Sequence, residues 1–292
     1  MAVRMAIANH KGGVAKSTTT MMVAEGLAVQ HGLRVLVIDM DPQCSVSTMM
    51  LSREGADEQA DRGRSISTLL KRLANKEPIH LSKFISNKAS DLLALRDATD
   101  ARRVDLIASH RMLLVELDGI EAMFRERSSN GFSKKVAAAL EPELNRIDKS
   151  YDVILFDCPA SAGALTLIAL RLSQYLLAPT VLDAVSMTAL SDFIGIVVQN
   201  GVTHIQLKVL PTIFKAGDPE QRLTLDHIRA GVLGLNAFTT PVPDTVHIRR
   251  AGKRLRPDSY RDLREKYGGA VSDLTDLAAA VLEFISTKEM KR

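Results

Sequence analysis

The chain has 292 residues, of which 46% are hydrophobic and 25% charged, the composition of a folded globular protein with a sizeable core. No apolar run approaches the roughly 18 residues that a membrane span needs, and the first residues lack the long apolar segment of a secretory signal. The net charge of +4 is mild, and two cysteines without a Cys-x-x-Cys spacing argue against a disulfide framework or a zinc site and favour a reducing cytoplasm.

Short apolar runs alternate with helical patterns, which is typical of βαβ units and a parallel sheet. The predicted strands cover residues 3–9, 34–39, 151–157, 174–179 and 205–214. A helix between the first two strands is expected to end at Gly32, and the amphipathic pattern over 270–288 predicts a helix docked on the sheet. The polar segments 52–66 and 125–135 are expected to be exposed connections, too short to divide the chain. We therefore predict one α/β domain over residues 1–292, a mostly parallel twisted sheet flanked by helices.

The stretch IANHKGGVAKSTTT, residues 7–20, follows the first predicted strand and opens the first predicted helix. In this context backbone N–H groups and a helix N-terminus can converge on an anion. Gly12 and Gly13 let the backbone approach phosphate oxygens, and Lys16 can reach the β- and γ-phosphates. The hydroxyl of Ser17 is placed to ligate Mg²⁺. However, both glycines of the general pattern G-x-x-x-x-G-K-[ST] are replaced, so the motif needs support from other parts of the chain.

Acidic residues at the ends of two other predicted strands supply this support. Asp39 and Asp41 lie two residues apart in VLVIDMDPQ, so their side chains are expected to point the same way. Asp157 ends the strand 151–157, the usual place of a carboxylate that holds Mg²⁺ through water. Open α/β sheets bind ligands at the carboxyl ends of their strands, so the loop and these acids can meet there.

The stretch KGGVAKST resembles the deviant Walker A motif, K-G-G-x-x-K-[ST], of the ParA/MinD ATPases, in which the position of Ala15 is often glycine. The resemblance continues through DMDPQ, DCPASAGALTLIAL (157–170), VLPTIF (209–214) and PVPDTVHIRRAGK (241–253). One departure is Ala160, which follows Pro159 where the family usually has a second proline. The resemblance covers nearly the whole chain outside residues 52–100. It implies a P-loop NTPase fold with ATP and Mg²⁺ as cofactors.

The same resemblance assigns roles to individual residues. In this family the first lysine of the motif reaches across an ATP-bound homodimer to the partner's phosphates, where a cation offsets charge on the transferred phosphoryl group. The position of Asp41 orients the attacking water, and Asp157 and Asp39 belong to the water shell of a Mg²⁺ held by Ser17. The implied catalytic residues are Lys11, Lys16 and Asp41. The implied nucleotide-binding residues are Lys11, Gly12, Gly13, Val14, Ala15, Lys16, Ser17 and Thr18, with Thr212, Pro243 and Asp244 at the adenine.

The basic residues are concentrated in the run HIRRAGKRLR, residues 247–256, which contains no acid. Such a run is often only a solvated face, but this one follows PVPDT, where ParA-like proteins carry residues that bind DNA without sequence preference. Contact with DNA phosphates releases counterions and needs no base contacts. Because the first strand begins near residue 3, we expect no preceding helix-turn-helix domain. The implied DNA-binding residues are Arg249, Arg250, Lys253 and Arg254.

The resemblance thus implies a slow, partner-stimulated ATPase associated with the nucleoid, which positions a plasmid, a chromosome origin or a protein assembly with a ParB-like or cargo adaptor protein. One alternative is a MinD-like ATPase that acts at a membrane surface, which needs a basic amphipathic helix free to lie on lipid. The tail, EFISTKEMKR, has no bulky apolar face after its basic residues, so no membrane partner is expected. A second alternative is a metabolic P-loop ligase or reductase subunit, for which the sequence offers no recognisable substrate pocket or metal site.

Overall fold

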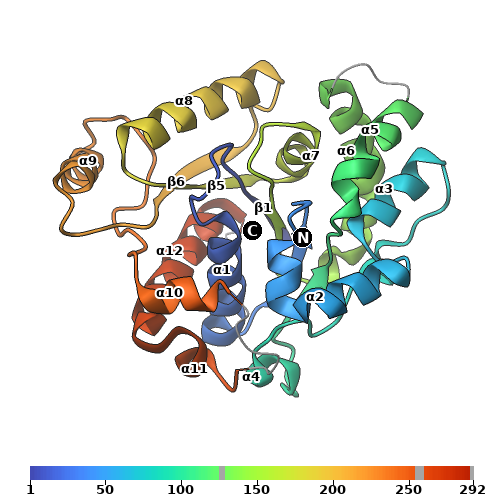
Figure 1. The fold of residues 1–292 in the computed structure, drawn as a ribbon, viewed down its shortest axis with the longest axis horizontal. Helices are drawn as coiled ribbons and strands as arrows, with labels where there is room; N and C mark the ends of the chain where they lie inside the picture. Colours follow the sequence, from blue (N-terminus) through green and yellow to red (C-terminus); the bar gives the residue numbers. More distant parts are fainter. Residues whose placement is uncertain (125–128, 254–259, 290–292) are drawn as a thin grey trace.

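Six parallel strands form one sheet in the computed structural model, which describes residues 1–124, 129–253 and 260–289 (Figure 1). The strands lie in the order β3-β2-β4-β1-β5-β6, and each pair of neighbours is parallel. Their bounds are β1 Val3–Ile7, β2 Arg34–Asp39, β3 Arg103–Ile107, β4 Val153–Asp157, β5 Tyr175–Thr180 and β6 Gln206–Pro211. The predicted α/β class with a mostly parallel sheet is therefore confirmed.

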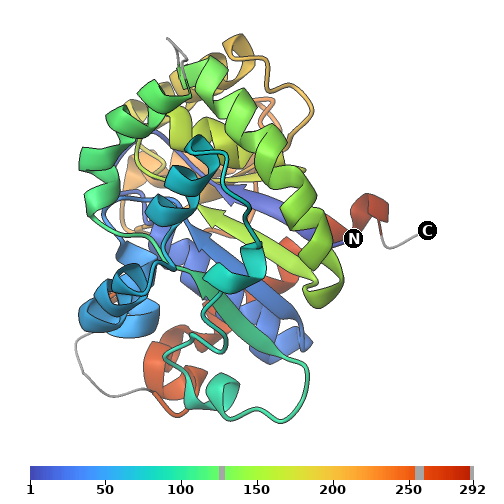
Figure 2. The ribbon, with the colours of Figure 1, turned by 90° about the vertical axis from the view of Figure 1, so that its right-hand side faces the viewer.

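Helices cover both faces of this sheet (Figures 1 and 2). Alternate residues of β1 belong to different cores, because successive side chains of a strand point to opposite faces. Met5 and Ile7 belong to the cluster that contains Leu27 of α1 and Leu274 of α12, whereas Ala6 belongs to the cluster on the other face. Strands buried on both faces read as continuous apolar runs, which is why most of them could be recognised in the sequence.

The helices have the following bounds: α1 Lys16–His31, α2 Ser45–Asp61, α3 Ile66–Ala74, α4 Leu93–Arg96, α5 Met112–Met123, α6 Ser129–Ile147, α7 Ala164–Leu172, α8 Ala184–Gln199, α9 Pro219–Arg229, α10 Val246–Ala251, α11 Leu263–Tyr267 and α12 Val271–Glu289. Three 3₁₀ turns cover Leu81–Phe84, Asp148–Ser150 and Gly268–Ala270. In the described part of the chain, none of these helices is both long and apolar enough to cross a membrane.

The helix predicted to dock on the sheet, α12, packs mainly against α1 and also contacts the sheet through Phe284 and Tyr175 of β5. A Cβ added to Gly26 of α1 would lie 2.7 Å from the Cβ of Ala278, so glycine allows the two helices to approach closely. The apolar side chains Leu274, Val281 and Ile285 of α12 are buried in the core below α1. The apolar face of α12 is therefore used inside the protein. Helix α1 itself ends at Gly32, which adopts the left-handed conformation (φ 69°) expected of a glycine cap.

The prediction of an exposed loop over residues 52–66 is wrong. Helix α2 continues to Asp61, and only a short turn separates it from α3 at Ile66. The helix is broken at Ser52, whose backbone is left-handed (φ 69°, ψ 170°), and the hydroxyl of Ser52 accepts a hydrogen bond from the N–H of Gly55 at 3.3 Å. Ser52 thus caps a second helical segment, which is mostly solvent-exposed and for that reason has a polar sequence.

Two other differences concern polar segments. Strand β3 was not predicted, because it is an edge strand that carries Arg103 and Asp105 within five residues. The predicted connection over residues 125–135 is replaced from Ser129 onward by α6, and residues 125–128 lie outside the described residues.

Candidate active site

The phosphate loop, residues 8–15, is held at both ends by side chains from neighbouring strands. Asn9 is fully buried, and its amide donates hydrogen bonds to the carbonyl of Pro179 (2.9 Å) and the hydroxyl of Thr180 (3.2 Å) at the end of β5. Its carbonyl oxygen accepts from the N–H of Lys11 at 3.1 Å. The hydroxyl of Thr212, just after β6, donates to the carbonyl of Val14 at 3.1 Å. The loop is thereby fixed in shape before any ligand contacts it.

Thr212 has no exposed surface, so its side chain supports the loop from behind. The hydroxyl is directed to the Val14 carbonyl, and the predicted place of Thr212 beside adenine stays a prediction. Thr212 is a positioning residue for the loop in this structure.

Two residues of the loop have left-handed backbones, Gly13 (φ 74°) and Ala15 (φ 62°). Glycine adopts this conformation without steric cost, whereas a residue with a Cβ is strained in it. Ala15 is also the N-cap of α1, where the backbone must turn into the helix. The departure from the usual glycine therefore preserves the loop geometry and adds strain to it.

Lys16, Ser17 and Asp157 converge at the start of α1. The ammonium of Lys16 is buried within the loop and donates to the carbonyl of Lys11 at 3.1 Å. Burial lowers the pKa of Lys16, and the charges of Asp157 and Asp41 oppose this shift. The hydroxyl of Ser17 donates to Oδ2 of Asp157 at 2.8 Å, and that of Thr20 donates to Oδ1 at 2.6 Å. The structure therefore brings the predicted loop and the predicted carboxylate of β4 together.

Asp39 holds the segment after β2 in place. Its Oδ2 accepts hydrogen bonds from the N–H (2.9 Å) and hydroxyl (2.7 Å) of Ser47, and its Oδ1 accepts from the N–H of Asp41 at 3.0 Å. Both carboxylate oxygens are thus engaged with protein donors, and the side chain is fully buried. The predicted place of Asp39 in a metal's water shell stays a prediction, since both oxygens of Asp157 accept protein hydrogen bonds in the same way. The hydrogen bonds of Asp39 make it a positioning residue for Asp41.

Asp41 is mostly buried at this edge of the sheet, with 8% of its surface exposed. Its Oδ1 accepts from the N–H of Gln43 at 2.9 Å, which fixes the orientation of the carboxylate. The shift of the Lys16 pKa includes the charge of Asp41, so the two side chains interact electrostatically. An oriented carboxylate beside a phosphate loop can align a water molecule through a hydrogen bond.

The two lysines of the loop lie in different surroundings. Lys16 is turned into the loop, whereas the ammonium of Lys11 lies at the N-terminus of α8, 2.6 Å from the hydroxyl of Ser186 and 3.5 Å from Oδ1 of Asp183. The side chains of Lys11 and Asp183 are 30% and 36% exposed. Burial alone would raise the pKa of Asp183, but hydrogen bonds from Ser186 and the charge of Lys11 lower it. The ammonium of Lys11 is therefore partly exposed and is held by α8, whereas that of Lys16 is buried in the loop.

The residues around Asp157 fit a divalent cation. Asp39 and Asp157 are neighbours in the β2–β4 register and both are fully buried. Burial raises the pKa of Asp157 to about 7, and burial together with the charge of Asp157 raises the pKa of Asp39 to about 8. Excess buried negative charge beside a serine hydroxyl is a setting in which Mg²⁺ binds through hydroxyl, carboxylate and water oxygens. Ser17 and Asp157 are the residues that would hold it.

The segment from 241 to 253 follows the edge of the same site. Pro243 forms a β-bridge with Phe214, and the N–H of Asp244 donates to the carbonyl of Phe214 at 2.9 Å. The carboxylate of Asp244 forms an ion pair with Arg249, a partner that the sequence did not indicate. These bonds leave the predicted contact of Pro243 and Asp244 with adenine untested.

Of the predicted DNA-binding residues, Arg249, Arg250 and Lys253 are exposed on α10 and the turn after it. Arg249 is neutralised by Asp244, whereas the side chains of Arg250 and Lys253 have no ion-pair partner in the described part of the chain. Arg254 lies outside the described residues. The charge available on α10 is therefore mainly that of Arg250 and Lys253.

Sequence analysis missed the residues that position the site: Asn9, Thr180, Ser47, Asp183 and Ser186. Asn9 ends the predicted strand 3–9 and Ser47 follows DPQ, so a polar residue at a strand end was the only available signal. Asp183 and Ser186 form an N-cap with hydrogen bonds of 2.7 Å and 2.9 Å, and the spacing D-x-x-S gives no indication of a lysine from another loop.

Comparison with known proteins identifies the family of the chain. The AAA_31 family model, described as an AAA domain, matches residues 2–208. The sequence is 25% identical to the sporulation initiation inhibitor protein Soj of Bacillus subtilis over 281 residues, which are 94% of this chain and 98% of Soj. It is 26% identical over 259 residues to a protein described as replication protein A in Rhizobium rhizogenes, covering 85% of this chain. The chain spans only 59% of the length of that rhizobial relative.

Solved structures show the same fold. McdA of Cyanothece, solved as a point variant in complex with ATP, superposes with a TM-score of 0.72 and 17% identity and covers 99% of this chain and 98% of McdA. Cobyrinic acid a,c-diamide synthase of Mycobacterium smegmatis, solved with ADP and magnesium, superposes with a TM-score of 0.69 and 23% identity and covers 98% of this chain and 96% of the synthase. At 23% and 17% sequence identity, these similarities show a shared fold and no more.

Proposed function

Because the chain belongs to the AAA_31 family of AAA domains, within the ParA/MinD type of P-loop ATPases, we propose that it is a dimerising ATPase that binds DNA without sequence preference and positions a cargo. ATP would close a homodimer, and hydrolysis would open it. The cargo would be a plasmid, a chromosome origin or a protein assembly, recruited through a ParB-like or adaptor protein. The protein would act in the cytoplasm at the nucleoid.

One observation carries the proposal: the different placement of the two loop lysines. Lys16 is buried in its own loop, where it can bind phosphates of the same protomer, but Lys11 lies at the surface beside Ser186 and Asp183. A partly exposed cation at the rim of a phosphate loop is available to a second protomer. Supplied in trans, it would act as an arginine finger does.

In the proposed reaction, an oxygen of water attacks the γ-phosphorus of ATP and the bond to the β–γ bridging oxygen breaks, giving ADP and phosphate. Asp41 orients the water, and Lys16 and the partner's Lys11 offset the charge that develops on the phosphoryl oxygens, while Ser17 and Asp157 would hold Mg²⁺. When bound, Mg²⁺ neutralises charge on the phosphates. Turnover is expected to be slow until a partner protein improves the alignment of Asp41 and the water.

DNA binding is proposed for the exposed basic side chains on α10. Arg250 and Lys253 can neutralise phosphates and release counterions. In a closed dimer the contacts of two protomers would act on one duplex, so ATP would strengthen binding. Support for this part comes from unpaired charge on α10 and from the resemblance of the surrounding motifs to ParA-like proteins.

ATP turnover and dimerisation of three variants test the catalytic part. Lys16→Ala should lose nucleotide binding. Asp41→Ala should still bind ATP and dimerise, with hydrolysis reduced on the order of a hundredfold or more. Lys11→Ala should bind ATP without closing the dimer, measured by analytical ultracentrifugation. Normal hydrolysis by a dimer of the Lys11→Ala variant would exclude the trans role of Lys11.

DNA binding is tested separately, by titrating unrelated duplex sequences with ATP, with ADP and without nucleotide. Arg250→Glu with Lys253→Glu should abolish binding and leave ATP binding intact. Arg249→Glu is a poor test, because it would place a second carboxylate beside Asp244. Equal affinity in all three nucleotide states would contradict the switch, and ATP-dependent binding to anionic vesicles without DNA binding would favour a membrane-surface ATPase.

A further inference from the structure

A second basic surface lies beside α2, outside the phosphate loop and α10. It consists of two adjoining pockets of about 480 Å³ and 390 Å³, which share Arg64, Ile85 and Asn87. We name this surface the α2–α4 groove and define it by Gln59, Arg64, Lys83, Ser86, Lys88 and Arg96. We propose that the α2–α4 groove binds phosphates of duplex DNA and extends the contact region that begins on α10. This inference rests on the proposed DNA binding.

The groove carries positive charge without carboxylates among its described lining residues to balance it. No carboxylate belongs to the described residues that line either pocket. Arg64 and Lys83 are exposed, and their side chains have no ion-pair partner among the described residues. The ammonium of Lys88 donates to the carbonyl of Ala98 at 2.9 Å, a neutral partner that leaves its charge in place. Three positive charges therefore remain for an anionic ligand.

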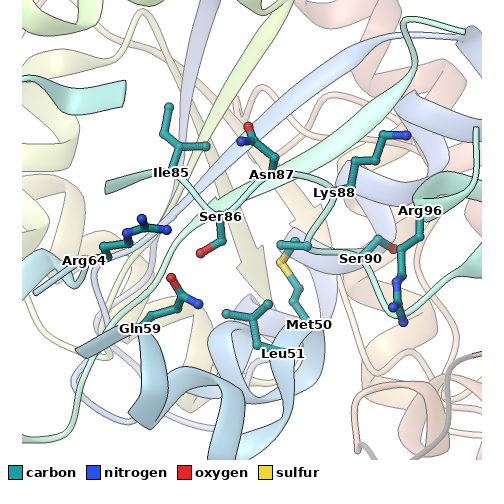
Figure 3. A pocket seen from close by; sticks show the side chains of 11 residues that line it. Met50, Leu51, Gln59, Arg64, Ile85, Ser86, Asn87, Lys88, Ser90 and Arg96 are labelled. Atoms are coloured by element: carbon teal, nitrogen blue, oxygen red, sulfur yellow. The ribbon is translucent and has the colours of Figure 1, made fainter. Parts of the chain in front are cut away.

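The groove also contains polar atoms that lack hydrogen-bond partners among the described residues. The hydroxyl oxygen of Ser86 and Oε1 of Gln59 are buried and have no hydrogen-bond partner among the described residues. Their polar ends gather with the guanidinium of Arg64 at one end of the pocket, while Lys88 and Arg96 lie at the other (Figure 3). Buried polar atoms are normally satisfied. The exposed guanidinium of Arg64 can donate to a phosphate oxygen directly, and rotation of the Ser86 and Gln59 side chains would turn their hydroxyl and NH₂ groups toward the same oxygen.

Lys88, in the wall of the groove, has a strained backbone. Its φ of 50° is left-handed, a conformation that is strained for a lysine, and its N–H is fixed by Oδ1 of Asp105 at 2.7 Å. Strained backbones that persist are concentrated at functional positions. In this case the conformation places the lysine side chain on the wall of the groove.

The groove also lies beside Tyr260, the first described residue after Lys253. Seven residues after Lys253, the N–H of Tyr260 donates to the carbonyl of Asp91, and its carbonyl accepts from the N–H of Leu93, both at 2.8 Å. The segment 91–94 leads directly into α4, which carries Arg96 of the groove. Tyr260 is thus attached to the segment that leads to Arg96 of the groove. A duplex lying on Arg250 and Lys253 would have further basic residues along the same surface.

The experiment measures affinity for duplex DNA with ATP over a range of salt concentrations. Arg64→Glu and Lys88→Gly are compared with two matched controls, Arg222→Glu on α9 and Lys76→Gly. Arg222 is exposed and lies on the other side of the molecule, as the position of α9 in Figure 1 shows. Lys76 is also left-handed (φ 58°) but lines neither pocket. Replacement by glycine removes strain at both lysines, so Lys88→Gly should be at least as stable as the wild type.

The groove variants should bind on the order of tenfold more weakly per lost contact at 0.1 M salt, with a salt slope reduced by about one per protomer. The controls should keep the wild-type slope. If the groove variants behave as the controls do while Arg250→Glu abolishes binding, the groove proposal is wrong and the proposed function stands. If the wild type binds no DNA, the proposed function itself fails. Saturable binding of inorganic phosphate to the wild type, lost in Arg64→Glu without any change in DNA affinity, would reassign the groove to a small anion.

Discussion

Gly252 lies directly against Thr18, so that a Cβ built on Gly252 would come within 2.8 Å of the Thr18 hydroxyl oxygen and 3.5 Å of its methyl group. Thr18 is in the first turn of α1, next to Ser17, and Gly252 lies between Arg250 and Lys253. The basic run therefore rests on the helix that carries the phosphate loop. This contact places the C-terminal end of α10 against the first turn of α1.

Gly252→Ala should therefore disturb both regions. The new methyl group must displace Thr18 or α10, and overpacking of this kind costs about 1 to 3 kcal/mol in the free energy of unfolding. We expect weaker DNA binding and a smaller effect of ATP on it, measured by titration with and without nucleotide. The double variant Thr18→Ala with Gly252→Ala should recover part of the lost stability, because the obstructing atoms are gone. Gly195→Ala inside α8, where a Cβ would meet nothing within 4 Å, is the control and should raise the free energy of unfolding by about 0.5 to 1 kcal/mol without changing DNA binding. If the effects of the two single substitutions on the free energy of unfolding simply added up in the double variant, the contact between Thr18 and Gly252 would be contradicted.

The position of Lys11 leads to a second prediction. Closing a dimer through Lys11 requires its ammonium to leave Ser186 and Asp183. Asp183→Asn removes the charge but keeps an oxygen that can cap α8. Because the pair is about one-third exposed, its contribution is small, and ATP-dependent dimerisation should strengthen by about 1.5- to 5-fold. Sedimentation of the variant with ATP measures this change. Weaker dimerisation would mean that Asp183 is needed in the closed state.

The sequence predicted the centre of the site well because its chemistry is local. A phosphate loop between a strand and a helix, and acids at strand ends, must meet at the carboxyl edge of a parallel sheet. Thus Lys16, Ser17 and Asp157 were placed correctly relative to one another. The hydrogen bonds of Asp39 with Ser47 could not be predicted in the same way, because Ser47 lies eight residues further along the chain and turns back to it.

Polar segments were the hardest to predict. Strand β3 has charged residues because it lies at the sheet edge, and the second half of α2 is mostly exposed and so has no apolar periodicity. The ion pair of Asp244 with Arg249 was also invisible, because both residues had separate functional explanations in the motif PVPDTVHIRRAGK. Long-range pairing of exposed polar groups leaves no pattern in a single sequence.

The strain at Ala15 gives a third prediction. Ala15→Gly removes a Cβ from a left-handed backbone and should stabilise the protein by about 1 kcal/mol. Gly13→Ala introduces the same strain at φ 74°, where a Cβ would meet nothing within 4 Å, and should destabilise it by a similar amount. Chemical denaturation of the two variants measures these opposite effects. If both variants changed the free energy of unfolding in the same direction and by the same amount, backbone strain in the loop would not determine its contribution to stability.

A buried charge network connects α1 with α11. The ammonium of Lys266 donates to Oε1 of Glu25 and Oδ1 of Asp91, both at 2.7 Å, and the hydroxyl of Tyr267 donates to Oε2 of Glu25 at 2.7 Å. Burial raises the pKa of Glu25 to about 7, although the charge of Lys266 opposes this shift. Burial alone would lower the pKa of Lys266, but Glu25 and Asp91 outweigh it and raise the value. The charge of Lys266 thus compensates two buried carboxylates, those of Glu25 and Asp91.

The fourth prediction concerns the effect of pH on this network. A carboxyl whose pKa is raised on folding binds its proton more tightly in the folded state, so its contribution is present at low pH and is lost as pH rises from about 4.5 through about 7. Relative to Glu25→Gln, the free energy of unfolding of the wild type should therefore fall with increasing pH in this window, by up to about 1.4 kcal/mol per pH unit. Denaturation of both proteins from pH 4.5 to pH 7.5, the range in which Glu25 is expected to titrate, tests the sign. A difference that rises with pH would show that Glu25 stays charged throughout.

Lys266→Met gives the last prediction, because it removes the only cation that contacts both Glu25 and Asp91 in the described part of the chain. Two buried carboxylates would then face each other without compensation, which costs about 3 to 5 kcal/mol near neutral pH. Protonation of Glu25, whose pKa burial raises to about 7, relieves the repulsion, so the loss should shrink as the pH is lowered toward 5. Lys71→Met is the matched control: Lys71 pairs with Glu116 at 2.6 Å but is 45% exposed, and its loss should cost less than about 1 kcal/mol. Thermal and chemical denaturation at two pH values measure both variants. If Lys266→Met were as mild as Lys71→Met, burial of this network would contribute nothing to the stability of the contact between α1 and α11.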